Sequence, residues 1–148
     1  MTASEQQITS GANALQLQPY IFFYGRCEEA LEFYKNAFGG TYDAMRNSDS
    51  PVDEQVPADW GNKIMHASFT GNGVQFLCSD GREAQSIDPE EGNVSLALSA
   101  SDGPTGERVF NALAQGGKIT MPIDNAFWGG RFGSVQDKFG IEWLVTLP

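Results

Sequence analysis

The sequence repeats one order of secondary structure twice, and this repeat limits the fold more than any other feature. In the first half, a strand at residues 17–23 precedes a helix at 28–38, and in the second half a strand at 95–101 precedes a helix at 106–115. A Gly-Gly pair ends each helix and further strands follow it. This repeated pattern therefore predicts an α+β fold of two βαβββ modules. We expect each module to form a curved antiparallel sheet with one helix behind it, and the two sheets to enclose a cleft.

The two helices are predicted from the spacing of their apolar residues. In each segment these residues recur at steps of three and four, which places them on one stripe of a helix. The first stripe consists of Ala30, Leu31, Tyr34, Ala37 and Phe38, and the second of Val109, Phe110, Leu113 and Ala114. We expect both stripes to be buried.

A hairpin in the first half decides which strand residues share a face. Residues 63–70 and 74–79 flank Gly71-Asn72-Gly73, which is a strong hairpin signal. With Asn72-Gly73 as the loop, Ala67 faces Cys78 and Phe69 faces Phe76. His66, Ser68 and Thr70 then lie on the other, more polar face.

The C-terminal run predicts a second hairpin, with strands at 131–135 and 141–147 and a turn at 137–140. Two Trp, three Phe and one Arg crowd this hairpin and the residues before it. Such a set is typical of a pocket wall.

Composition indicates a single acidic globular domain. The chain has 148 residues, of which 41% are hydrophobic, enough to bury a core. Its formal charge of -10 opposes binding to nucleic acid or to anionic lipid. No stretch approaches the ~20 apolar residues of a membrane span, and the start lacks a signal-peptide pattern, so we expect a cytoplasmic protein. Residues 1–14 are predicted as a flexible tail and residues 15–148 as one domain.

Four sequence elements occur in the order that is found in a known superfamily. They are FY-x-x-x-FGG at residues 33–40, KIMHA at 63–67, Met121-Pro122, and FW-G…D-x-FG-x-x-W at 127–143. With the duplicated plan, they resemble the PhnB-like branch of the vicinal oxygen chelate (glyoxalase/bleomycin resistance/dioxygenase) superfamily over about residues 15–147. The resemblance implies a homodimer that binds a small molecule. The methyltransferase label sometimes given to this branch has no support in the residues, because Rossmann-like alternation is lacking.

Enzymes of this superfamily typically hold one divalent metal with four side chains. Carried over by the resemblance, these positions fall at or near Pro19, His66, Ser95 and Leu144. Only His66 is a ligand type, whereas a catalytic zinc or iron centre needs about three protein ligands. Gln18 and Glu142 lie close by, but we expect neither to substitute, because a step of one residue turns a strand side chain to the other face. We predict no cofactor, with weak binding of a divalent metal as the alternative.

His66, the only histidine, is the candidate catalytic residue. It is expected in the pocket as a hydrogen-bond partner or general base, with a structural His or a metal ligand as alternatives. Cys78 is disfavoured as a nucleophile paired with His66, because it shares the apolar face of Phe69 and Phe76. Both Cys27 and Cys78 are expected to be reduced thiols.

Six further residues are candidates for ligand binding. Arg131 either pairs with a ligand carboxylate or phosphate or forms an ion pair with an acidic residue. Trp60, in a long acidic loop, is expected as a lid or a dimer contact. The remaining candidates are aromatic residues that we expect to line the cleft, namely Trp128, Phe127, Tyr20 and Phe22.

These observations lead to one predicted function with two alternatives. The prediction is a protein that binds a small organic ligand in an aromatic cleft, without an intact superfamily metal site. The alternatives are a metal-dependent lyase or dioxygenase-type enzyme with His66 as one ligand, and a metal-free acid/base enzyme using His66. The identity of the ligand, the pathway and the occurrence of catalysis stay open.

Overall fold

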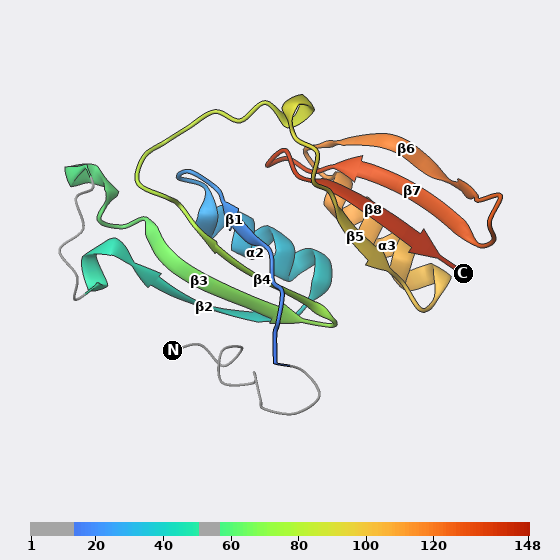
Figure 1. The fold of residues 1–148 in the computed structure, drawn as a ribbon, viewed down its shortest axis with the longest axis horizontal. Helices are drawn as coiled ribbons and strands as arrows, with labels where there is room; N and C mark the ends of the chain where they lie inside the picture. The colour runs from blue at the N-terminus through green and yellow to red at the C-terminus, as the bar shows by residue number, and fades with distance from the viewer. Residues whose placement is uncertain (1–13, 51–56) are drawn as a thin grey trace. The chain divides into compact units, whose positions relative to one another are not determined.

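The computed structural model describes residues 14–50 and 57–148, which fall into two compact units (Figure 1). Unit 1 comprises the described residues of Met1–Leu31 and Gly39–Ala84, and unit 2 comprises Glu32–Phe38 and Gln85–Pro148. All but one residue of the tail predicted at 1–14 lies outside the described residues. The single domain at 15–148 and the cleft between two sheets stay predictions.

Unit 1 contains a four-stranded sheet, sheet A, with the strand order β1-β4-β3-β2. Strands β2, β3 and β4 pair in antiparallel fashion, whereas β1 pairs with β4 in parallel. The strands are β1 (Tyr20–Phe22), β2 (Thr41–Arg46), β3 (Ile64–Gly71) and β4 (Val74–Ser79), and short 3-10 turns follow at η1 (Asn47–Asp49), η2 (Ala58–Trp60) and, in unit 2, η3 (Pro89–Glu91).

Unit 2 contains sheet B, whose strand order β5-β8-β7-β6 repeats that of sheet A. Its elements are β5 (Leu96–Ser99), α3 (Gly103–Ala114), β6 (Lys118–Asn125), β7 (Arg131–Gln136) and β8 (Glu142–Leu147). The other long helix of the described residues is α2 (Cys27–Phe38). Strand β5 pairs with β8 in parallel. The α+β class and the two βαβββ modules are therefore confirmed.

The expectation of purely antiparallel sheets is wrong, because both sheets are mixed. In each module the first strand is separated from the other three by a helix. A helical crossover is the connection that lets a strand join a sheet in parallel, whereas tight turns join antiparallel neighbours. None of the helices within the described ranges is long and apolar enough to span a membrane.

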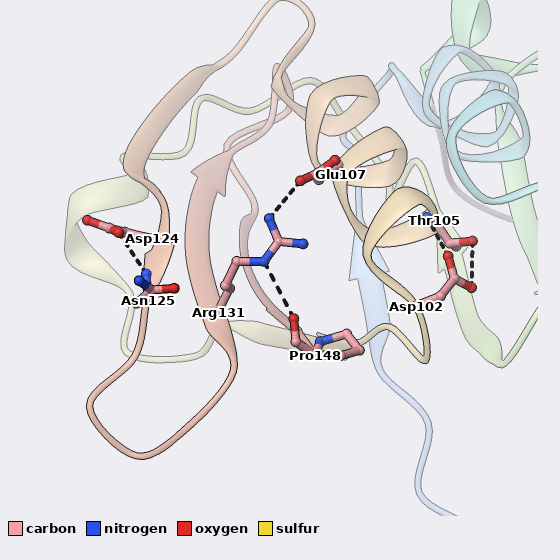
Figure 2. A network of polar contacts seen from close by, with 7 residues as sticks. All are labelled: Asp102, Thr105, Glu107, Asp124, Asn125, Arg131 and Pro148. Carbon is pink, nitrogen blue, oxygen red and sulfur yellow. Dashed lines mark hydrogen bonds and ion pairs between the residues drawn. The ribbon is translucent and has the colours of Figure 1, made fainter.

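The expected burial of the helical stripes is confirmed in full for the first and in part for the second. All five residues of the first are buried. Of the second, Phe110 and Leu113 are buried, whereas Val109 and Ala114 are half-buried. Helix α3 starts earlier than predicted, because Asp102 caps it. The Asp102 carboxylate accepts hydrogen bonds from the Thr105 backbone N–H at 2.8 Å and from the Thr105 hydroxyl at 3.0 Å (Figure 2).

The predicted register of the β3-β4 hairpin is confirmed. Ala67 pairs with Cys78 and Phe69 with Phe76, and all four side chains are buried. Asn72 adopts a positive φ of 52°, which Asn tolerates better than most residues in a tight turn.

A β-bulge in β3 changes this alternation near the start of the strand. Met45 of β2 lies opposite His66, but the next residue, Arg46, lies opposite Ile64, so Met65 is the extra residue. Ile64 is buried like Ala67, although simple alternation would place it on the face of His66. The bulge therefore turns the start of β3 toward the buried side of sheet A.

The segments that carry the resemblance build a buried network in unit 2. The Tyr34 hydroxyl donates to Asp137, and the same carboxylate accepts hydrogen bonds from Trp143 Nε1 at 2.8 Å and from the backbone N–H groups of Phe139 and Ile141 at 2.9 and 3.0 Å. Asp137 is only 3% exposed. These motif residues thus stabilise the fold.

Candidate functional site

One face of sheet A carries exposed aromatic side chains together with the only histidine. This face, opposite the buried side chains of Ala67 and Phe69, is called the open face below, and its central residues are Tyr20, Phe22, Met45 and His66. Tyr20 and Phe22 of β1 are 42% and 50% exposed. His66, on β3, is half-buried. The structure therefore brings together three of the predicted site residues.

The rings on the open face lie close enough to act as one surface. The Tyr20 ring centroid is 5.0 Å from that of Phe22 and 6.0 Å from that of His66. Tyr24, which follows β1, stacks on Phe22 at 5.8 Å. Such a surface offers stacking to a planar ligand, and the imidazole offers a hydrogen bond.

Two residues of this surface were not foreseen from the sequence. Neither Tyr24 nor Met45 is among the site residues predicted from the sequence. Met45 lies opposite His66 and is exposed. Because its side chain is flexible and polarizable, it adapts to ligands of different shape. The pairing of β2 with β3 places Met45 on the open face, but the sequence alone does not reveal that pairing.

Trp60, which is expected as a lid or a dimer contact, is buried within unit 1. It is 7% exposed, and its Nε1 donates to Gly81 O at 2.9 Å. Lys63 Nζ lies 5.7 Å from the centre of its ring. Trp60 therefore packs within unit 1, and the geometry gives no support to direct ligand contact.

Phe127 and Trp128 lie together in the loop between β6 and β7 of unit 2. Their ring centroids are 4.9 Å apart, and Trp128 also contacts Phe132 at 5.8 Å. Phe127 is 97% exposed and Trp128 is largely exposed. Both are free to meet a ligand or a partner protein, and their role in a ligand site stays a prediction.

Arg131 forms the ion pair that was one of its two expected roles. Its Nη1 lies 2.7 Å from Glu107 Oε1 on helix α3, and its Nε donates to Pro148 O at 3.5 Å (Figure 2). Arg131 lies opposite Leu147 in the sheet and points toward α3. This placement favours a structural role over an anion anchor.

The four positions implied for a superfamily metal do not supply a metal-binding set. Within residues 14–50 and 57–148, no group of three or more His, Cys, Asp or Glu residues is arranged to hold an ion. The expectation that Glu142 lies on the wrong face is incorrect, because it stands two residues before Leu144 and shares its face. The Ser95 hydroxyl donates to the Glu142 carboxylate at 2.5 Å. Even so, Leu144 has no metal-binding atom and the Ser95 hydroxyl is a weak ligand, so sheet B offers too few ligands for a tightly held metal.

The two cysteines are neighbours in the core of unit 1. Both are free and fully buried, and their Sγ atoms are 3.5 Å apart. The hydrogen bond with Cys78, together with burial, raises the pKa of the Cys27 thiol far above its usual range. Cys78 also lies on the face opposite His66, so this pair is not a nucleophile and its base.

Comparisons with known proteins place this geometry in a family. The family model described as 3-demethylubiquinone-9 3-methyltransferase matches residues 15–146. Protein PA1353 from Pseudomonas aeruginosa is 38% identical, with a TM-score of 0.76 over 90% of this chain and 97% of that one. A putative 3-demethylubiquinone-9 3-methyltransferase, PhnB protein, from Bacillus cereus is 31% identical, with a TM-score of 0.70 over 90% of this chain and 100% of that one.

A more distant structure links the fold to the superfamily. A member of the glyoxalase/bleomycin resistance protein/dioxygenase superfamily from Sphaerobacter thermophilus is 18% identical and has a TM-score of 0.53, over 90% of this chain and 98% of that one. This likeness concerns the fold alone. The matched family model covers nearly the whole sequence, so the chain belongs to the PhnB-like, 3-demethylubiquinone-9 3-methyltransferase-like family, whose fold is that of the glyoxalase/bleomycin resistance superfamily.

Proposed function

We propose that the open face of sheet A binds a small organic ligand with a planar, largely apolar part. The observation that carries this proposal is the exposure of two neighbouring aromatic rings, Tyr20 and Phe22, beside the only histidine. Exposed aromatic side chains that are grouped on one face mark interaction sites more often than scattered ones do. The rings supply stacking, and His66 supplies one directional polar contact.

The proposal includes no resident cofactor. The donor set at the four superfamily positions does not fit a tightly held metal, so binding does not pass through an ion. Weak binding of a divalent ion through His66 is the alternative. Metal content of the purified protein, followed by titration with Zn²⁺ and Ni²⁺, tests it: tight stoichiometric binding that is lost in His66→Ala would replace this proposal with a metalloenzyme.

We also propose a homodimer that stays in the cytoplasm, in which residues 15–148 act as one domain. The family resemblance supports these points, and light scattering on the purified protein measures the oligomeric state. Phe127 and Trp128 are proposed to add to the ligand site. Methyl transfer, which the family description names, is not proposed, because each sheet is small and mixed rather than the parallel sheet of a dinucleotide-type fold.

The test uses a fluorescent planar probe, 8-anilinonaphthalene-1-sulfonate, followed by a panel of small aromatic compounds. We expect Phe22→Ala and Met45→Ala to weaken probe binding. Met121→Ala is the matched control for Met45→Ala, because Met121 is also exposed, at 51% against 41%, but lies on β6 of unit 2. Equal affinity in all variants would refute the open face as the ligand site.

His66→Ala separates simple binding from acid/base catalysis. If the face only binds, affinity falls by the loss of one hydrogen bond, roughly five- to tenfold. If His66 is an acid/base catalyst, turnover of a substrate from the panel collapses while affinity largely survives.

A further inference from the structure

A second, polar pocket lies in unit 1, and its lining differs in character from the open face. It has a volume of about 360 Å³, within the range of pockets for small molecules. Its lining consists of Gly25, Glu28, Arg46, Asn62, Lys63, Ile64 and Asp80. None of the open-face residues belongs to this lining.

The β-bulge in β3 explains how this pocket is separated from the open face. Met45 and His66 lie opposite each other on the open face, but the bulge turns Ile64 to the buried side of the sheet. Arg46, the partner of Ile64, reaches Glu28 of helix α2. Bulges commonly re-aim side chains near functional sites. Strands β2 and β3 therefore contribute Met45 and His66 to the open face, and Arg46 and Ile64 to the polar pocket.

Asp80 holds the walls of the pocket in place. Its Oδ1 accepts hydrogen bonds from the backbone N–H groups of Gly25 and Cys27, and its Oδ2 accepts one from Ile64, each at 2.8 Å. The carboxylate is 1% exposed. The three donors compensate its charge and join the loop after β1, the start of α2 and the start of β3. The pocket is thus preorganised.

Two cations line this pocket in a chain that carries only nine Lys and Arg residues and a net charge of -10. Lys63 Nζ donates to Gly25 O at 2.9 Å. Arg46 donates from Nη1 to Asn62 O at 2.6 Å and from Nη2 to Glu28 Oε2 at 2.7 Å. Among the described residues these bonds use one of the three ammonium N–H groups and two of the five guanidinium N–H groups.

Glu28 is the group that an incoming anion would replace. Its side chain is 59% exposed, and exposed ion pairs contribute little to stability. Arg46, and more weakly Lys63, lower the pKa of the Glu28 carboxyl. Both cations therefore interact with the same anionic group, which is the exposed carboxylate of Glu28.

We propose that this pocket binds a small organic anion, whose carboxylate or phosphate group displaces Glu28 and is held by Arg46 and Lys63. The planar guanidinium can give two parallel hydrogen bonds to an oxyanion, and the ammonium can give a third. The volume leaves room for an organic group beyond the oxyanion. This site is independent of the aromatic ligand proposed for the open face.

The experiment titrates the protein with inorganic phosphate in one arm and with succinate in the other, at matched ionic strength, by calorimetry. Saturable binding in either arm is expected, and the stronger arm identifies the oxyanion. Lys63→Gln and Arg46→Gln are expected to weaken binding about tenfold or more, and Lys63→Arg to retain it. Lys118→Gln, which removes an exposed cation of unit 2, is the control and is expected to bind as the wild type does.

Glu28→Gln provides the sharpest test, because its predicted effect has the opposite sign. Removing the competing carboxylate frees Arg46 and removes a repulsion, so the oxyanion is expected to bind several-fold more tightly. No binding in both arms, equal binding in Lys63→Gln, or weaker binding in Glu28→Gln would overturn the proposal. Phe22→Ala is expected to leave oxyanion binding unchanged, so failure of the open-face proposal is distinguishable from failure of this one.

Discussion

Replacing Tyr34 with Phe tests whether the residues that carry the family resemblance act through a buried carboxylate. The hydroxyl of Tyr34 donates to Asp137, which is almost fully buried. A hydrogen bond to a charged group contributes about 1.5–3 kcal/mol. Asp137 keeps three other N–H donors after the change, so we expect the lower part of that range, about 1.5–2 kcal/mol.

Urea denaturation followed by circular dichroism measures this loss, and thermal melting is expected to show a decrease of roughly 3–8 °C for a chain of this size. The matched control is Tyr20→Phe, which removes the same atom from a half-exposed ring and is expected to change stability by less than about 0.5 kcal/mol.

A double-mutant cycle identifies the partner of the Tyr34 hydroxyl. If Tyr34 acts through Asp137, the cost of Tyr34→Phe shrinks in an Asp137→Asn background, because the charged acceptor is already gone. Equal costs for Tyr34→Phe and Tyr20→Phe, or an undiminished cost in the Asp137→Asn background, would refute this reasoning.

Two further predictions concern the backbone and a helix cap. Gly40→Ala is expected to destabilise the protein by more than about 2 kcal/mol, because φ is 97° and a Cβ would lie 2.4 Å from Thr70 O. Gly73→Ala is the control, because Gly73 has a similar φ of 87° but open space around it, and we expect it to cost about 1 kcal/mol. Urea denaturation measures both changes. Asp102→Ala is expected to lower the melting temperature at neutral pH through loss of the α3 cap. Hydrogen bonds from Thr105 lower the pKa of Asp102, so its contribution is full above the ordinary value of 3.8 and is lost as pH falls through the lowered value. An unchanged difference between Asp102→Ala and wild type in strong acid would contradict this origin.

The repeat, the helical stripes and the β3-β4 register could be predicted from the sequence because each depends on local periodicity. Ala67 and Phe69 alternate with polar residues, and Asn72-Gly73 allows only a few turn geometries. The parallel pairing of β1 with β4 could not be read in this way. It joins residues more than fifty positions apart, and no pattern within β1 itself specifies its neighbour.

The sheet face on which His66 lies could be predicted from the sequence, whereas the partners of individual side chains could not be identified from it. The parity of β3 placed His66 correctly away from Cys78. The burial of Trp60 depends on Gly81, and the pairing of Arg131 depends on Glu107, each more than twenty positions away. The bulge at Met65 depends on the pairing of β3 with β2, and the hydrogen bonds of Asp80 join it to Gly25 and Cys27, so these features are likewise non-local. Aromatic and charged residues in loops therefore cannot be assigned to a ligand before their nearest side chains are known.

Three of the motif residues that define the family resemblance lie in the core rather than at a ligand site. Tyr34, Asp137 and Trp143, which carry the resemblance, are buried and bonded to one another. A residue with all its polar groups satisfied in the core has none left for a ligand. These three residues therefore stabilise the fold, and the proposed ligand sites use other residues. On sheet A, four of those residues lie outside the shared motifs: Tyr20, Phe22 and Met45 of the open face, and Arg46 of the polar pocket. Relatives that share the motifs but differ at these four positions are expected to bind different ligands, because the scaffold and the site vary independently.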